Sequence, residues 1–323
     1  MSLNGVGHLA GKNIAVTGAG NGIGRAIALA CAAEGAKVVV ADYGVSMEGS
    51  DPSSEVADAV VAEIAAAGGT AIAVAGDVSE MEVGQRIVDT AVENWGSIDG
   101  VVCVAGIVRE RMLFNMSEEE FDHVVGVHLK GHFTLYKAAS AVMRKQETGG
   151  SLVGFTSGAF VASTAQANYS AAKGGIVSLT RSAAFALKKY GVNANCIAPA
   201  AMTRMSENVP FEIEAGGPEA IAPLAVWLMS DAARDVTAQI YTCTGKRIAV
   251  WNQPAEIRHM WADDGASFSV DEIAEKLPAT IGDEEMPMFA DLERRMKEMA
   301  LAKEQAKEAK EQAEEQAGSA SGA

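Results

Sequence analysis

A phenol, an ammonium group and a hydroxyl occur in an arrangement suited to proton transfer. Tyr169 and Lys173 stand four residues apart in the stretch YSAAK, so on a helix both side chains share one face. A neighbouring positive charge favours phenolate, which would lower the pKa of Tyr169 from about 10 toward neutrality. Thr156 and Ser157 follow an apolar run a short distance upstream. The pattern predicts a general acid–base site.

A glycine-rich loop, TGAGNGIG at 17–24, comes directly after a β-branched run and before an alanine-rich stretch. Glycine lets a backbone turn sharply and approach a ligand closely, and the free amides at a helix N-terminus attract phosphate. The position between strand and helix predicts a site for a dinucleotide diphosphate. The candidate residues in this loop are Gly18, Asn21, Gly22, Ile23 and Gly24.

Asp42 ends the second β-branched run, 18 residues after Gly24. A carboxylate there accepts hydrogen bonds from both hydroxyls of an adenosine ribose and repels a 2′-phosphate. This predicts NAD rather than NADP as the cofactor. Two alternatives remain open, namely that Asp42 only caps a helix or loop, and that Arg25 pairs with a 2′-phosphate.

Short β-branched runs alternate with longer alanine-rich stretches along residues 1–250. This rhythm predicts an α/β fold, a doubly wound parallel sheet of about seven strands with helices on both faces. Ser79 with Glu82 and Ser117 with Glu120 mark two helix starts. The expected strands are 12–16, 37–41, 70–75, 100–104, 151–155, 193–198 and, with less support, 239–244.

Two stretches interrupt this rhythm. Residues 43–55 form a turn-rich loop longer than most strand–helix connections and are interpreted as an insertion. After a catalytic domain at 1–250, the chain is divided into a proline-punctuated extension at 251–288 and a charged tail at 289–323. The tail is expected to form a helix over 289–317.

The composition disfavours several classes of partner. Of 323 residues, 26 are Lys or Arg and 42 are Asp or Glu, and a net charge of −16 repels nucleic acid and anionic membranes. No apolar run is long enough to span a bilayer and no secretory leader is evident, so a cytoplasmic protein is expected. The cysteines at 31, 103, 196 and 243 lack metal-ligand spacing and are interpreted as reduced core residues.

With these motifs the sequence resembles the short-chain dehydrogenase/reductase family from about residue 9 to 244. The resemblance implies one Rossmann-like domain, NAD(P), hydride transfer between a secondary alcohol and a ketone, and homodimers or homotetramers built through the long helices around the fifth strand. The matching landmarks, in order, are TGAGNGIG, GDV at 76–78, VAG at 104–106, HLKG at 128–131, FTS at 155–157, YSAAK and IAP at 197–199.

The resemblance assigns catalytic roles to matching positions. Tyr169 would be the acid–base group, Lys173 would hold the nicotinamide ribose and lower the pKa of the tyrosine, and Ser157 would orient the substrate oxygen. Strand register favours Ser157, whereas the commonest family spacing, counted back from Tyr169, reaches Thr156. His128 stands where the family has an asparagine whose main-chain carbonyl holds a water leading to the lysine. The alternative is a packed His128 with an idle ring.

The remaining cofactor contacts are also implied by the resemblance. Asp77 and Val78 would flank the adenine, Pro199 would line the nicotinamide face, and Thr203 would approach the carboxamide. The segment after the fourth strand contributes Val104, Ala105 and Gly106. The family usually has asparagine where this chain has Val104 and glycine where it has Ala200.

Within the family, the 43–55 insertion, the 107–133 segment and His128 are similar to the (3R)-hydroxyacyl-CoA dehydrogenase part of peroxisomal multifunctional enzyme type 2. This implies a 3-hydroxyacyl-CoA or a similarly bulky alcohol as substrate. Two alternatives are a steroid, terpenoid or small-alcohol dehydrogenase that does not use CoA, and a catalytically silent NAD-binding scaffold. Candidate cations for the CoA phosphates are Arg109, Arg111, Arg204, Lys246 and Arg247.

Overall fold

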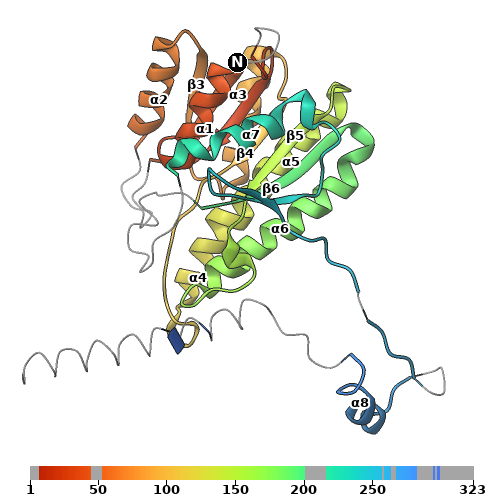
Figure 1. The fold of residues 1–323 in the computed structure, drawn as a ribbon. Helices are drawn as coiled ribbons and strands as arrows, with labels where there is room; N and C mark the ends of the chain where they lie inside the picture. The colour runs from red at the N-terminus through yellow and green to blue at the C-terminus, as the bar shows by residue number, and fades with distance from the viewer. Residues whose placement is uncertain are drawn as a thin grey trace, which may run out of the picture. The chain divides into compact units, whose positions relative to one another are not determined.

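The computed structural model describes residues 7–44, 53–200, 216–256, 258–262 and 267–281, together with Arg294, Lys297 and Glu298. Two compact units are present, Met1–Gln253 and Pro254–Ala323. The larger unit contains the sheet and its helices (Figure 1). The further division of the C-terminal part at residue 288 stays a prediction, and the expected 289–317 helix lies almost entirely outside the described residues.

The sheet has eight strands in the order β3-β2-β1-β4-β5-β6-β7-β8. The first seven are parallel, and β8 pairs antiparallel with β7 as a hairpin. Strand order reverses at β1 and β4, as in a doubly wound fold. The strands are β1 Asn13–Thr17, β2 Lys37–Asp42, β3 Thr70–Ala75, β4 Gly100–Cys103, β5 Gly150–Phe155, β6 Val192–Pro199, β7 Ile240–Cys243 and β8 Ile248–Val250.

All seven expected strands are present, and β8 is the addition to the expected count. Its short exposed run is only three residues long, and Ile248 and Val250 remain more than half exposed. A three-residue run carries too little periodicity to be distinguished from a loop.

Helices cover both faces of the sheet (Figure 1). Helices α1, α2 and α7 pack on one face and α3, α5 and α6 on the other. The described helices of this unit are α1 Gly22–Ala33, α2 Glu55–Ala66, α3 Met81–Trp95, α4 Glu118–Val125, the π-helix η2 Gly126–Lys130, α5 Gly131–Gln146, α6 Ala167–Leu187 and α7 Ala222–Met229, with short 3₁₀ turns between them.

The central strands are buried on both faces, which explains their continuous apolar runs. In β1, Ile14 and Val16 pack toward α1 and α7, while Ala15 packs toward α3 and α5. Side chains of a strand alternate between faces with period two. The two cores therefore hold the carboxyl ends of the strands in fixed positions.

One of the two predicted helix starts is confirmed. Ser117 accepts a hydrogen bond from the Glu120 amide, and the Glu120 carboxylate accepts one from the Ser117 amide, which completes a capping box. The Ser79 prediction is wrong, because α3 begins at Met81 after Glu80 with no side-chain cap. The Ser79 amide instead donates to Asp77.

Within the described ranges, no helix has the length and apolar character needed to cross a membrane. The same part of the chain has no cluster of metal-ligating side chains. Cys31, Cys103, Cys196 and Cys243 are buried free thiols. In the smaller unit, the described structure includes helix α8, Val270–Lys276, which Ser269 caps.

Candidate active site

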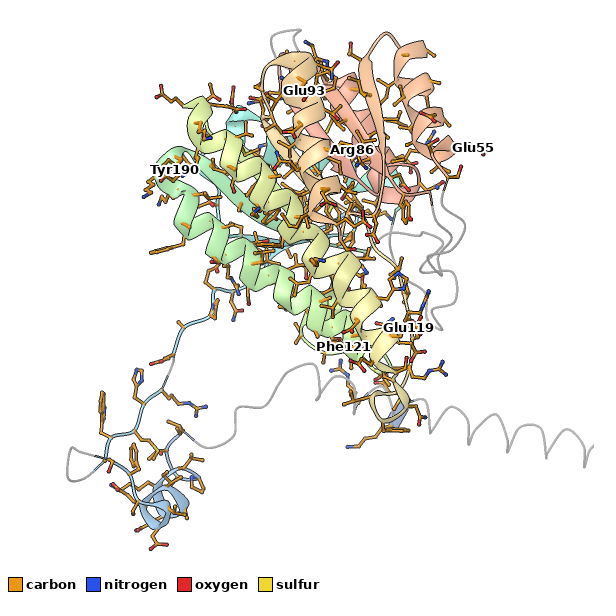
Figure 2. The ribbon with its side chains drawn as sticks, turned by 180° about the vertical axis from the view of Figure 1, so that it is seen from behind. Glu55, Arg86, Glu93, Glu119, Phe121 and Tyr190 are labelled. Atoms are coloured by element: carbon orange, nitrogen blue, oxygen red, sulfur yellow. The ribbon has the colours of Figure 1, made fainter. Side chains whose placement is uncertain are left out.

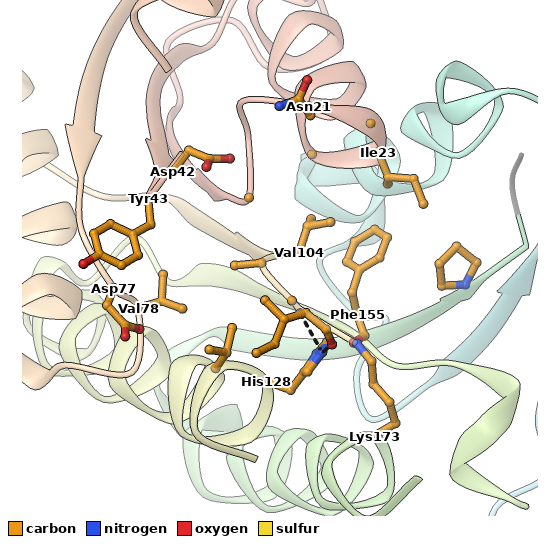
Figure 3. Close-up of a pocket in the computed structure, with 18 of the residues that line it drawn as sticks. Asn21, Ile23, Asp42, Tyr43, Asp77, Val78, Val104, His128, Phe155 and Lys173 are labelled. Atoms are coloured by element: carbon orange, nitrogen blue, oxygen red, sulfur yellow. Dashed lines mark hydrogen bonds between the residues drawn. The ribbon is translucent and has the colours of Figure 1, made fainter. Parts of the chain in front are cut away.

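A cavity of about 540 Å³ opens at the carboxyl ends of the parallel strands. It lies where the strand order reverses between β1 and β4, the place at which open α/β sheets bind ligands. Figure 3 shows Asp42 and Asp77 toward one end, Lys173 toward the other, and Val104 between them. Its volume is within the range of roughly 300–1,000 Å³ typical of small-molecule sites.

The turn from β1 to α1 leaves no room for a side chain at Gly18 or Gly24. Gly18 has φ +65°, and a Cβ there would lie 2.8 Å from the Ala105 backbone. A Cβ on Gly24 would overlap the carbonyl oxygen of Gly18. Asn21 precedes α1, but its side chain makes no capping hydrogen bond. The loop can therefore lie close against an anionic group at the helix N-terminus.

Asp42 is tied to the glycine loop. Its Oδ2 accepts a hydrogen bond from the Gly20 amide at 2.8 Å, and its Oδ1 accepts one from the Gly44 amide at 2.7 Å. Each carboxylate oxygen can accept a further bond. Arg25 forms an ion pair with Glu63. The charged group presented at this end of the cavity is therefore the Asp42 carboxylate, because Arg25 is already paired.

Tyr169 lies next to Ser157, not Thr156. The nearby Ser157 side chain partly opposes the effect of burial on the pKa of Tyr169. The Thr156 hydroxyl is buried and donates to the Lys173 carbonyl at 2.8 Å. Burial raises the pKa of Tyr169 in the cofactor-free protein, and the lowering expected with the nicotinamide ribose bound stays a prediction.

Lys173 does little to offset the effect of burial on Tyr169. Its side chain is 3 % exposed, and its Nζ donates to the Phe155 carbonyl at 2.6 Å while lying 5.3 Å from the centre of the Tyr169 ring. Burial lowers the pKa of Lys173 to about 7. An amine that is only partly protonated at neutral pH and directed at a carbonyl stabilises phenolate weakly.

His128 lies in the π-helix η2 and is 1 % exposed. Its Nε2 is 2.8 Å from the Ile107 carbonyl oxygen and 3.2 Å from the Ile107 amide, and its ring contacts Tyr169 edge-on at 5.1 Å. Burial, with a contribution from the Lys173 charge, lowers the pKa of His128 well below 6.5, so the ring is neutral. His128 is thus a packed helix residue whose ring supports the chain after β4, and its part in proton relay stays a prediction.

Most of the residues predicted for the site line this cavity. Among the described residues the lining includes Thr156 but not Ser157, and Thr203 lies outside the described residues. The predicted residues that line it are Gly18, Asn21, Gly22, Ile23, Gly24, Asp42, Asp77, Val78, Val104, Ala105, Gly106, His128, Tyr169, Lys173 and Pro199.

Several lining residues were missed. Tyr43 and Gly76 adjoin the predicted Asp42 and Asp77, so their positions next to strand ends were a usable signal. Pro218, at the start of a 3₁₀ turn before α7, carried no such signal. The other missed residues are Ile107, His123, Val127 and Phe155.

Comparison with known proteins agrees with this site. Residues 18–245 match the family described as enoyl-(acyl carrier protein) reductase. Hydroxyacyl-CoA dehydrogenase ChsB1 of Mycobacterium tuberculosis is 41% identical over 285 residues, 83% of this chain and 88% of that protein. Peroxisomal multifunctional enzyme type 2 of Mus musculus is 42% identical over 227 residues, which is 70% of this chain and 30% of the mouse protein.

Solved structures show the same fold. A short-chain dehydrogenase from Mycobacterium avium superposes with a TM-score of 0.77 at 42% identity, covering 87% of this chain and 98% of that one. A short-chain dehydrogenase from Mycobacterium paratuberculosis bound to NAD has a TM-score of 0.68 at 26% identity, covering 74% and 98%. The chain therefore belongs to the short-chain dehydrogenase/reductase family of NAD(P)-dependent oxidoreductases.

Proposed function

We propose that this protein oxidises a 3-hydroxyacyl-CoA with NAD, or reduces the corresponding 3-ketoacyl-CoA with NADH. The observation that carries the proposal is one cavity that joins the glycine loop and Asp42 at one end to Tyr169 and Lys173 at the other. When bound, the nicotinamide would accept the hydride from the alcohol carbon. The side chains of this chain would handle the proton of the alcohol oxygen.

The residues fit a dinucleotide. The side-chain-free turn at Gly18 and Gly24 and the uncapped start of α1 suit a diphosphate. Asp42 would hold the ribose hydroxyls, and its charge together with the Arg25–Glu63 ion pair supports NAD over NADP. Thr203 would approach the carboxamide, as the family resemblance implies.

Proton transfer would centre on Tyr169. As a neutral phenol it donates a proton to a ketone oxygen, and as phenolate it accepts one from an alcohol. Ser157, whose side chain lies near the phenol, would hold the substrate oxygen. In the cofactor-free protein the raised pKa of Tyr169 favours the neutral phenol, which is the form needed for reduction. Oxidation therefore requires that the binding of cofactor and substrate stabilise the phenolate.

The named activity of the relative ChsB1 and of the peroxisomal enzymes supports a hydroxyacyl-CoA substrate. The chain covers only 30% of the mouse enzyme and 26% of its yeast counterpart, so no hydratase or epimerase activity is inferred. Arg111 is paired with Glu120 and is a poor candidate for CoA phosphates. Lys246 and Arg247, exposed at the β7–β8 turn, are better ones.

Turnover of a 3-hydroxyacyl-CoA should exceed turnover of its free acid by at least about tenfold, because only the thioester offers the remote CoA contacts that can be used at the reacting carbon. Nicotinamide absorbance with NAD and NADP in parallel measures this, and NAD should be preferred. Equal rates for thioester and free acid would indicate a dehydrogenase that does not use CoA. No turnover despite NAD binding would indicate a silent scaffold.

Ser157→Ala should lower kcat by roughly 10²-fold or more, because the substrate oxygen loses a positioned hydroxyl. Thr156→Ala should retain turnover and lose stability of about 1 kcal/mol, because the hydroxyl is used on the Lys173 carbonyl. Steady-state kinetics and thermal melts of both variants test this. The reverse pattern would show that Thr156 occupies the catalytic position.

We infer a homodimer or homotetramer formed through α5 and α6, which lie side by side on the face seen in Figure 2. Phe133 on α5 is 44 % exposed and Phe185 on α6 is 91 % exposed, and aromatic side chains at such exposure are typical of subunit contacts.

The four free thiols support a reducing compartment, so we also infer a cytoplasmic location.

A further inference from the structure

His132 is a fully buried titratable residue that the proposed mechanism does not use. It is 1 % exposed and lies on α5, one turn after His128. Its Nδ1 is 2.6 Å from the His128 carbonyl oxygen, and its Nε2 is 3.1 Å from the Phe155 amide nitrogen. One imidazole therefore bridges the π-helix η2 and the end of strand β5.

The two partners determine the state of this ring. The Phe155 amide can only donate, so Nε2 must accept, and the His128 carbonyl can only accept, so Nδ1 must carry the proton. Burial and the nearby Lys173 charge lower the pKa of His132 to about 3, although the nearby His128 and Cys103 carbonyls oppose this. His132 is thus a neutral ring with a single tautomer.

The reason for the bridge lies in the sheet. Strand β4 ends at Cys103, which pairs with Gly154. Thr156 directs its amide to Ile197 of β6, and since alternate residues of a strand point their backbone groups to opposite sides, Phe155 directs both of its groups toward β4. In this register the Phe155 amide faces the Cys103 carbonyl, and no later residue of β4 is left to bind the Phe155 carbonyl. His132 accepts a hydrogen bond from the same Phe155 amide, and Lys173 donates one to the Phe155 carbonyl.

We propose that His132 is a positioning residue that holds the Phe155 peptide groups in the orientation at which the carbonyl receives the Lys173 ammonium. The same ring fixes the direction of the His128 carbonyl through its Nδ1–H. Because it touches no reacting atom, its effect on turnover is exerted through Lys173, and this effect rests on the proposed function.

Two substitutions distinguish the effect of the His132 hydrogen bonds from the effect of its packing. His132→Gln keeps one donor and one acceptor on a side chain of similar reach, whereas His132→Leu removes both. We expect His132→Leu to lower kcat by roughly tenfold to 10²-fold, the range that a small misplacement of a catalytic group produces, with little change in NAD affinity. His132→Gln should recover most of this loss. His8→Leu, at an exposed histidine, is the matched control.

Wild-type kcat in a folded His132→Leu protein would overturn the proposal, as would a folded His132→Gln protein as impaired as His132→Leu. Melting curves and fluorescence titration of NAD establish folding and cofactor binding for each variant.

A second measurement needs neither a variant nor turnover. Histidine ¹⁵N NMR of the intact protein should show His132 protonated at Nδ1 alone, without titration down to about pH 4. The opposite tautomer, or titration near pH 6, would refute the bridge even if dehydrogenase activity were present. If the protein shows no turnover while this tautomer is observed, the proposed function fails and the bridge stands.

Discussion

Tyr169→Phe is expected to lower kcat by about 10²–10⁴-fold, the contribution typical of a positioned general acid or base. The ring and its edge-on contact with His128 are retained, and only the hydroxyl next to Ser157 is lost. NAD binding should be little changed, because Asp42 and the glycine loop lie at the other end of the cavity. Single-turnover kinetics with a 3-hydroxyacyl-CoA gives the rate of the chemical step.

The control for this substitution is Tyr190→Phe, which removes a phenol at the partly exposed end of helix α6. It should turn over at the rate of the unchanged protein. A Tyr169→Phe enzyme with more than about a tenth of normal kcat would place the acid–base role elsewhere in the cavity.

Lys173→Met is expected to abolish most turnover while making the protein more stable near neutral pH. Burial lowers the pKa of this lysine from 10.5 to about 7, which corresponds to at most about 5 kcal/mol of lost stability when the amine is protonated. Removing the amine also leaves the Phe155 carbonyl without its partner, at a cost of about 1–3 kcal/mol. The net gain in the free energy of unfolding should be about 2 kcal/mol.

The gain in the free energy of unfolding from Lys173→Met should decrease as the pH rises. Between about pH 7 and 10.5 the unfolded lysine binds a proton that the folded one does not, so the stability of the unchanged protein rises with pH through this window. The difference in melting temperature should be largest at or below pH 7, shrink as pH rises, and reverse near pH 10. Comparing the two proteins at each pH cancels the titration of buried groups that Lys173 does not influence, such as Cys31 and Cys103. A constant difference would show that Lys173 is not buried in solution.

The sheet and most of the cavity could be predicted because both depend on local patterns. Parallel strands buried on both faces are continuous apolar runs. The turn needs glycine at Gly18 and Gly24 because a Cβ there would collide with the backbone of Ala105 or of Gly18. Strand β8 and Pro218 escaped prediction because a three-residue run and a single proline carry no periodic signal.

Electrostatics was the weaker part of the sequence-based prediction. The four-residue spacing of Tyr169 and Lys173 correctly placed both side chains in the cavity, but spacing says nothing about desolvation. In the cofactor-free protein burial raises the pKa of Tyr169, and the Lys173 amine is directed toward the Phe155 carbonyl. The bridging position of His132 likewise depends on how η2 and the end of β5 come together in three dimensions.

The two amides bound by Asp42 bear on any attempt to redirect this protein to the phosphorylated coenzyme. Exchanging the carboxylate for a neutral or basic side chain removes a charge, but it also strips the Gly20 and Gly44 amides of their acceptor. Under the proposed function, the same two oxygens would set both coenzyme selectivity and the conformation of the loop. A redesign would have to supply a substitute acceptor along with the new cation, so a single substitution at Asp42 would not suffice.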